Sequence, residues 1–398
     1  MELMNGISVI VCCYNSAWII ERCLNALLAQ QVPSSVLWEI IVVNNASTDD
    51  TERIANKVLQ KGHISYQLIN EPKAGLLNAR KCGIRAARYS YTIFCDDDNV
   101  LCDIYVSTMY DQMEKDSGLG ACGGLGIAEF QMASHPYVKK YIASYAIGSQ
   151  LDNVKANFLY GAGICVRTLL LRKIYSNYDL LLTGRCGNLL LSGDDSEMTK
   201  LMVLENYRLS YTDDAKFYHV LPSKRLTCKY LINMFKGFGL AYPILKAYDI
   251  ALNGKNPFVY ILFMYINILF NLLFNILFAV IKRKRVIWIF FWINAAKGLC
   301  YWGWNKLYYL SKSLKKILII FVLLASKKAV YEFLCVMNTF AAVTKTIESC
   351  TATQILKDFL FAIKQKPSRR ANRCRSSALE TSYLITCLKN GTRIRVTS

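Results

Sequence analysis

The sequence lacks the features that mark a zinc-binding or a secreted protein. It has only 3 His, and its 15 Cys include no Cys-x-x-Cys pair, which argues against a structural zinc site. The first residues contain neither a basic segment nor a long apolar segment, so no secretory signal is predicted. We therefore expect the amino-terminal part to lie in the cytosol with its thiols reduced.

Acidic residues are nearly missing from the last third of the chain. After residue 281 there are 22 Lys and Arg but only 4 Asp and Glu, whereas the two classes almost balance before it. This basic part lies beside long apolar runs. The pattern favours lipid headgroups over nucleic acid as the anionic partner.

One apolar run is long enough to cross a bilayer. Residues 258–281 carry no charge, and Asn267, Asn271 and Asn275 share one helical face within them. Shorter apolar runs follow at 286–296 and 317–325. A basic cluster at 282–285 would emerge outside if 258–281 crossed from the cytosol, against the positive-inside tendency. Two interpretations avoid this conflict: an interfacial or re-entrant hairpin on the inner membrane, or pairing of the Asn face with another helix in a homodimer.

Short apolar runs alternate with helical periodicity in the first hundred residues. Strands are predicted at residues 7–12, 39–43, 65–69 and 91–95, with helices at 19–31, 51–59 and 74–87 between them. Such alternation predicts an α/β fold, a mostly parallel sheet with helices on both faces. Ligands bind at the carboxyl ends of the strands in such sheets, and polar clusters follow each predicted strand there. Residues 120–222 are less regular. We interpret them as the part of the same domain that faces the acceptor, the second substrate of a group-transfer reaction.

Three consecutive acidic residues follow the fourth predicted strand. Carboxylates at i and i+2 of an extended segment point the same way, so Asp96 and Asp98 can share one divalent cation. Asp97, between them, is assigned to ligand binding. The alternative is an acidic turn that ends a strand.

A second acidic group, Asp194 and Asp195, precedes a helical pattern at 198–206. A carboxylate at a helix start can serve as a general base, and Asp195 is the residue we assign to this role, with Asp194 beside it. The alternative is an N-terminal cap that interacts with the helix dipole.

Three further groups are candidates for contacts with phosphate or nucleotide. The turn at 44–49 can contact a base or ribose through side-chain amides, or it is simply a strand-to-helix turn. Lys73 and Arg80 can meet a diphosphate, or they lie on an exposed basic face. His219 can complete a metal shell or contact phosphate with Arg225 beside it, although a lone His is more often structural.

Together, residues 7–15, 41–49 and 96–98 resemble the family 2 glycosyltransferases of the GT-A fold, over roughly residues 6–240. The resemblance implies that Tyr14, Asn15 and Asn45 line a nucleotide pocket. It also implies that Asp96 and Asp98 match the metal-binding Asp-x-Asp motif, with Mg²⁺ or Mn²⁺ as cofactor. Asp194-Asp195 resembles the family's Glu-Asp pair that carries the base, with Asp in place of Glu.

The family's processive members carry a Gln-x-x-Arg-Trp motif, which is missing here, so a processive synthase is disfavoured. The resemblance implies transfer from a nucleotide-sugar, with UDP as the expected nucleotide, to a glycan or polyprenyl-linked acceptor in surface polysaccharide assembly. The rival hypotheses are a transferase with a different acceptor and a catalytically degenerate nucleotide-binding scaffold at the membrane.

We therefore divide the chain into three predicted regions. They are a GT-A catalytic domain at 1–240, a membrane-associated helical region at 241–325, and a basic tail at 326–398. The expected location is the inner membrane, with the catalytic domain in the cytosol.

Overall fold

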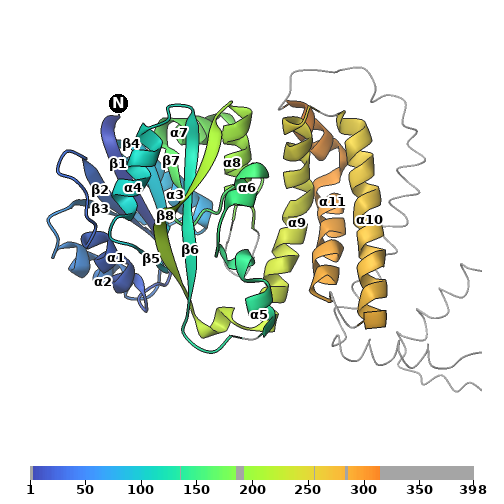
Figure 1. Ribbon diagram of the computed structural model, residues 1–398, viewed down its shortest axis with the longest axis horizontal. Helices are drawn as coiled ribbons and strands as arrows, with labels where there is room; N and C mark the ends of the chain where they lie inside the picture. The colour runs from blue at the N-terminus through green and yellow to red at the C-terminus, as the bar shows by residue number, and fades with distance from the viewer. Residues whose placement is uncertain (1–2, 135, 185–191, 255, 283–285, 314–398) are drawn as a thin grey trace, which may run out of the picture. The chain divides into compact units, whose positions relative to one another are not determined.

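A computed structural model describes residues 3–134, 136–184, 192–254, 256–282 and 286–313 of the chain (Figure 1). The predicted apolar run at 317–325, the predicted tail at 326–398 and most of the basic cluster at 282–285 lie outside these ranges. The described residues form a sheet with helices on both faces, followed by three long helices. The predicted α/β fold class is confirmed.

The first four strands form the parallel half of the sheet. Their spatial order is β3 (Ser65–Glu71), β2 (Trp38–Asn45), β1 (Met4–Cys13) and β4 (Tyr89–Asp96). The helices α1 (Ile20–Leu28), α2 (Thr51–Leu59) and α3 (Leu76–Ala86) connect them. All seven elements agree with the predicted ranges to within a few residues, because buried parallel strands are continuous apolar runs that are easily recognised.

The second half of the sheet is mixed. It continues from β4 through β7 (Cys165–Arg167), β6 (Leu119–Phe130) and β8 (Arg208–Leu221) to β5 (Asn99–Leu101). Strand β7 is antiparallel to both β4 and β6, whereas β6 and β8 are parallel. The remaining short helices are α4 (Tyr105–Glu114), α5 (Pro136–Lys140), α6 (Leu151–Lys155), α7 (Thr168–Asn177) and α8 (Asp194–Leu204), with 3-10 turns η1 (Ile142–Tyr145) and η2 (Ser223–Arg225).

Strand β6 is one of the elements that the irregular interpretation of residues 120–222 missed. Its glycines hide the strand pattern, because glycine disfavours strands and contributes no apolar side chain. Here the missing side chain is a packing requirement: a Cβ on Gly124 would lie 2.4 Å from the hydroxyl oxygen of Tyr105. The strand therefore depends on a tertiary contact that no local pattern reports.

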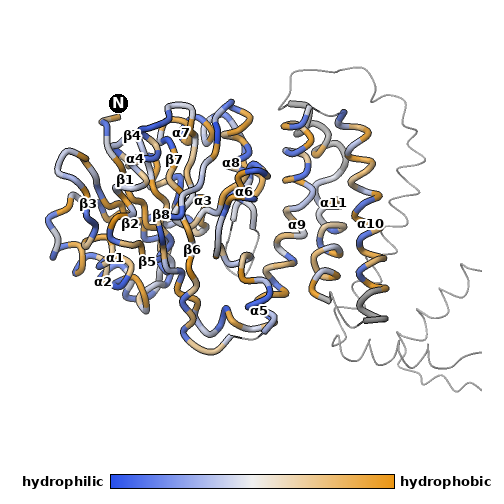
Figure 2. The backbone as a smooth tube through the Cα atoms, in the orientation of Figure 1, coloured by the Kyte–Doolittle hydropathy of each residue, from blue (hydrophilic) through white to orange (hydrophobic). Residues whose placement is uncertain are grey.

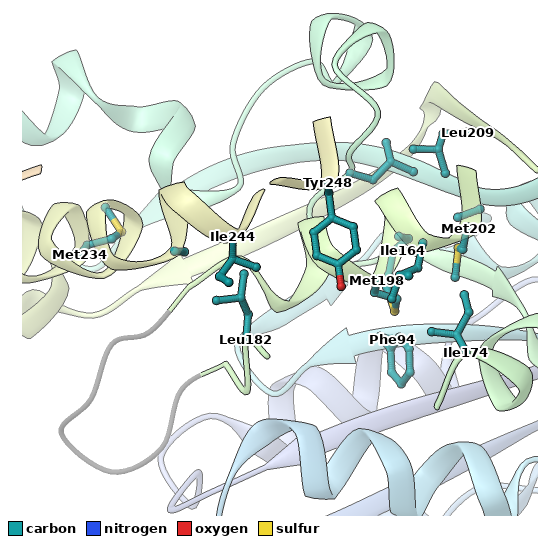
Figure 3. Close-up of a cluster of buried hydrophobic side chains, with 14 of the residues drawn as sticks. Phe94, Ile164, Ile174, Leu182, Met198, Met202, Leu209, Met234, Ile244 and Tyr248 are labelled. Atoms are coloured by element: carbon teal, nitrogen blue, oxygen red, sulfur yellow. The ribbon is translucent and has the colours of Figure 1, made fainter. Parts of the chain in front are cut away.

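The two faces of the sheet bury separate apolar clusters. Val9 and Val11 of β1 pack with residues of α1, α2 and α4, whereas Ile10 between them packs on the other face with α3, α7 and α8. Figure 3 shows the second cluster, in which Phe94 of β4, Met198 of α8 and Tyr248 of α9 (Cys228–Leu252) lie together. Helix α9 is thereby packed against the sheet domain.

Three long helices follow the sheet and lie side by side in Figure 1: α9, α11 (Val286–Ser313) and α10 (Pro257–Lys282). Helices α9 and α11 approach closely, since a Cβ on Gly239 would lie 2.2 Å from the carbonyl oxygen of Phe291. Helix α9 continues through residue 240. The boundary predicted at 240–241, between the catalytic domain and the membrane-associated region, therefore falls inside a helix that packs against the sheet domain.

Candidate functional site

The polar clusters lie together at the carboxyl edge of the parallel strands. Strand register places Cys12 of β1 opposite Asp96 of β4, and Cys13 opposite Asn44 of β2. The segments after β1, β2 and β4 therefore begin side by side, as expected for a ligand site in an open α/β sheet.

Asn15 joins the loops after β1 and β2. Its side-chain Oδ1 accepts a hydrogen bond from the Thr48 backbone at 2.8 Å, and its own N–H donates to Ser47 Oγ at 3.0 Å. The residue has φ 50°, a left-handed conformation that Asn tolerates better than most residues. Tyr14, directly before it, is 55% exposed and available to contact a ligand.

Asn45 uses its whole amide to shape the turn between β3 and α3. Its Nδ2 donates to the carbonyl oxygens of Glu71 and Lys73 at 3.0 and 2.8 Å, and its Oδ1 accepts from Gly75 N at 2.8 Å. The predicted contact with nucleotide would compete with these three bonds. Lys73 lies exposed on the same turn, where its side chain can reach an anion.

The three consecutive aspartates have different surroundings. Asp96 ends β4 and is half-buried. Asp97 accepts hydrogen bonds from Ser16 Oγ and from the Tyr14 backbone. Loss of hydration and the charge of Asp98 raise the pKa of Asp97 to about 7. Asp98 is only 2% exposed, and its Oδ2 lies 2.7 Å from Arg225 Nη1.

His219 is brought to the same point by β8. Its Nδ1 lies 2.8 Å from the carbonyl oxygen of Tyr145, which can only accept, so Nδ1 carries a proton. Its Nε2 lies 3.2 Å from Arg225 Nη1 and 3.4 Å from Asp98 Oδ1. Nε2 therefore has both a donor, the Arg225 guanidinium, and an acceptor, the Asp98 carboxylate, within reach.

A second group of charges forms where α8 begins. Arg80 of α3 pairs with Asp194 at 2.7 Å, and both side chains are largely buried. Asp195 accepts hydrogen bonds from the backbone N–H groups of Gly161 (2.9 Å) and Ser196 (2.7 Å). Gly161 is required here, since a Cβ would lie 2.5 Å from Arg80 Nη2. Asp195 is thus held by a loop as well as by its own helix start.

The pKa of Asp195 is raised to about 6. Burial is the largest cause, and the neighbouring Asp194 charge adds to it, while Arg80 and the two backbone donors act in the opposite direction. A carboxylate with a pKa near 6 is a better proton acceptor than an ordinary Asp and is still ionised at neutral pH.

Arg80 connects the two groups of carboxylates. It pairs directly with Asp194, and Asp96 is the next largest influence that raises the pKa of the guanidinium against the effect of burial. Its guanidinium also lies over the ring of Phe94, 5.1 Å from the centroid. The predicted metal-binding and base-bearing segments therefore lie in one neighbourhood, as a single active site needs. The individual roles assigned to them stay predictions.

The described part of the chain holds no preformed metal cage. Among the described residues, no three His, Cys, Asp or Glu side chains converge closely enough to hold an ion by themselves. The donor set nevertheless fits a hard cation with open positions: the Asp98 carboxylate and Nε2 of His219, whose ring is oriented by Tyr145. Mg²⁺ is typically held by one or two carboxylates together with substrate phosphates, so these residues fit it or Mn²⁺.

Sequence reasoning missed three supporting residues. Ser16 bonds Asp97, and Tyr145 orients His219. Glu197 is fully buried and accepts hydrogen bonds from the backbone of Leu181 and Leu182 and from the Tyr248 hydroxyl, which ties α8 to α9. Only Glu197 had a sequence signal, its position one turn into α8 after the acidic pair. The other two depend on long-range contacts.

Comparison with known proteins gives partial matches. The chain is 31% identical over 123 residues to poly-beta-1,6-N-acetyl-D-glucosamine synthase of Staphylococcus epidermidis, which covers 31% of this chain and 29% of that protein. It is 27% identical over 209 residues to glycosyltransferase AglE of Haloferax volcanii, or 52% of this chain and 64% of that protein. These matches span less than two thirds of either relative.

Among solved structures, a mannosyltransferase from Pyrobaculum calidifontis, in complex with GDP-Man and Mn²⁺, resembles the chain with a TM-score of 0.48 and 19% identity. The alignment covers 77% of this chain and 90% of that one. Residues 8–177 match the sequence model of the family described as Glycosyl transferase family 2. The match spans all four parallel strands and the aspartates after β4. Residues 8–177 of the chain are therefore similar to the family 2 glycosyltransferases.

Proposed function

We propose that the protein transfers a sugar, with inversion, from a nucleotide-sugar to a hydroxyl of a glycan or lipid-linked glycan in surface polysaccharide biosynthesis. UDP is the expected nucleotide. The observation that carries the proposal is that Arg80 links the two acidic groups: it pairs with Asp194 at 2.7 Å, and Asp96 also raises its pKa. The relatives that share part of the chain are named as glycosyltransferases, which supports the same reaction class.

Each of these groups of residues is assigned one role in the reaction. The acceptor oxygen forms a bond to the anomeric carbon while the bond from that carbon to the diphosphate oxygen breaks, and the diphosphate leaves with the electron pair. The acceptor proton passes to the Asp195 carboxylate. Tyr14, Asn15 and the turn held by Asn45 face the nucleotide, and Lys73 meets its phosphates. Arg80 keeps Asp194 in position, and the Gly161 N–H does the same for Asp195.

The cation is assigned to the other acidic group, Asp96–Asp98, together with His219. Asp96, Asp98 and His219 are the residues that would hold Mg²⁺ or Mn²⁺, with phosphate oxygens as the remaining ligands. When bound, the cation neutralises the charge that develops on the departing diphosphate. The buried Asp98 carboxylate beside an imidazole oriented by Tyr145 supports this assignment better than an acidic turn alone does.

We expect hydrolysis or transfer from one nucleotide-sugar, and loss of both on chelation. The full-length protein in detergent is incubated with each UDP-, GDP- and dTDP-sugar with Mn²⁺ or Mg²⁺, and the released nucleoside diphosphate is quantified with and without EDTA. A UDP-sugar should be preferred, and added Mn²⁺ in excess of EDTA should restore turnover. Activity that is unaffected by EDTA would contradict metal dependence, and no turnover with any donor would favour the degenerate scaffold.

We also propose that α10 attaches the enzyme to the inner membrane, with the catalytic domain in the cytosol. Residues 257–277 form one helix long and apolar enough to cross a bilayer, and Figure 2 shows α10 as mainly hydrophobic. One face, with Ile261, Met264 and Ile268, is buried within the chain. The other face exposes Val259, Leu262, Phe263, Ile266, Phe270, Leu273 and Leu277. An apolar stripe of this kind supports interfacial attachment.

The side-chain N–H groups of two Asn residues of α10 are bonded within the helix, whereas Asn275 Oδ1 is buried without a hydrogen-bond partner among the described residues. Asn271 and Asn275 donate from Nδ2 to the carbonyl oxygens of Asn267 and Asn271, four residues earlier, at 2.9 and 2.7 Å. Asn275 is 3% exposed and is therefore covered by its own chain. These contacts weaken the alternative in which the Asn face pairs with a second copy, and they leave the apolar stripe as the surface that contacts lipid.

Serine in place of Phe263, Ile266 and Phe270 together is expected to move most of the protein from the membrane pellet to the supernatant. These side chains are 55–66% exposed, so their replacement removes apolar surface without opening a core. The matched control replaces Leu151 and Leu169, which are 60% and 61% exposed on α6 and α7. A triple variant that still pellets after a high-salt wash would contradict the assignment.

A further inference from the structure

We propose that Arg225 is a resident counter-cation that occupies the metal position of the site, and that a divalent cation binds there only when the guanidinium moves away. The inference rests on the proposed metal-dependent function. It concerns what the site contains before the donor arrives, and it assigns to Arg225 a role that differs from simple contact with phosphate.

The geometry around the guanidinium carries the first step. Arg225 Nη1 lies 2.7 Å from Asp98 Oδ2 and 3.2 Å from His219 Nε2. These are the two atoms with lone pairs that a metal ion would use. His219 is held in the required tautomer by Tyr145, and Asp98 is 2% exposed. A cation thus already sits where two buried ligands converge.

The charges carry the second step. Asp98, Asp97 and Asp96 all act to raise the pKa of Arg225, with Asp98 the largest of them, against the opposing effect of burial. The guanidinium pairs directly with the nearest of these side chains, the Asp98 carboxylate. A divalent ion bound beside Asp98 while Arg225 stays in place would bring two positive charges, the metal ion and the guanidinium, into contact. The two cations must exclude each other.

The surrounding backbone shows how the exchange can occur. Arg225 ends the short turn η2, and its carbonyl accepts a hydrogen bond from the Tyr145 hydroxyl at 3.0 Å, so its main chain is held in place. Its side chain is 18% exposed, against 2% for Asp98, so it has a route towards solvent. A donor diphosphate at the site edge supplies an anion for the displaced guanidinium and further oxygen ligands for the metal.

It follows that metal binding should depend on nucleotide. Without a diphosphate, Mn²⁺ must break the Arg225–Asp98 ion pair and gains few ligands. With UDP, both the ligands and a new partner for Arg225 are present. A glutamine at position 225 keeps much of the side-chain length but removes the charge, so it should let Mn²⁺ bind without nucleotide.

The test measures Mn²⁺ binding to the full-length protein by the loss of the free Mn²⁺ EPR signal, with and without UDP. Arg225→Gln is compared with Arg225→Lys and with Lys224→Gln, which removes the same charge from the exposed neighbouring residue. Without UDP, we expect Arg225→Gln to bind Mn²⁺ at least about tenfold more tightly than the wild type. Arg225→Lys should be intermediate, and Lys224→Gln should match the wild type.

Thermal melting supplies a second readout. Arg225→Gln should melt below the wild type, because Asp98 loses its ion pair with the guanidinium, and Mn²⁺ without UDP should raise its Tm while leaving the wild-type Tm unchanged. The inference is overturned if both Arg225 variants bind Mn²⁺ no more tightly than the wild type while the wild type takes up Mn²⁺ with UDP. If the wild type takes up no Mn²⁺ even with UDP, the proposed metal site fails, and the inference fails with it.

Discussion

Asparagine in place of Asp195 is expected to lower kcat by about 10²- to 10⁴-fold, because the acceptor hydroxyl loses its general base. The substitution preserves the shape of the side chain. Donor affinity should therefore stay close to that of the wild type, as measured by titration with UDP or the preferred nucleotide-sugar. The two effects together identify a group that acts on the acceptor and not on the donor.

The pH profile gives a sharper test of the same residue. The carboxylate must be ionised to accept a proton, and its pKa is raised to about 6, so kcat/KM of the wild type should fall as the pH drops through about 6. An unperturbed Asp would place this fall near pH 4. The residual activity of Asp195→Asn should not show this fall in kcat/KM near pH 6, which we call the acidic limb of the pH profile.

The control for Asp195 is Asp194→Asn, which breaks the ion pair with Arg80 but leaves Asp195 in place. We expect a smaller loss of kcat and a shift of the acidic limb to lower pH, because the Asp194 charge contributes to the raised pKa of Asp195. Near-normal turnover in Asp195→Asn, with the wild-type pH limb retained, would remove the residue from the mechanism.

Alanine in place of Asp98 is expected to reduce turnover by about 10²- to 10³-fold or more, the range seen when a preorganised electrostatic contact to the reacting charge is removed. Unlike Asp195→Asn, it should also weaken donor binding, since the cation and the diphosphate share this side chain. Titration with nucleotide in the presence of Mn²⁺, together with kcat, separates the two residues.

Asp98→Ala also has a structural cost that must be measured separately. It leaves Arg225 buried without its main partner, and breaking a buried ion pair typically costs about 3–5 kcal/mol of unfolding free energy. The double variant Asp98→Ala with Arg225→Gln should recover part of that stability but none of the turnover. Asp152→Ala, at a side chain 94% exposed on α6, is the control for loss of a carboxylate. Unchanged donor affinity in folded Asp98→Ala would contradict its assignment.

Local sequence predicts a helix or strand well when the signals for that element lie within or directly beside it. The four parallel strands are apolar runs that end in polar residues, and α2 at residues 51–59 has the predicted bounds because its periodicity and its preceding acidic residues are local signals. Three Asp after an apolar strand indicate an acidic site at the sheet edge for the same reason. The irregular prediction for residues 120–222 was wrong because β6 exists through contacts such as Gly124 with Tyr105, which are invisible to local pattern.

The sequence by itself thus determined the parallel half of the sheet, the edge at which the site lies, and the residue types that the site contains. Only the tertiary structure decided which charges meet. Arg80 pairs with an aspartate 114 residues away, and Arg225 with Asp98 across a similar distance in the chain. The reason is physical: secondary structure follows from periodicities over a few residues, whereas an ion pair depends on how strands and helices pack, and that packing brings together residues with no local relation.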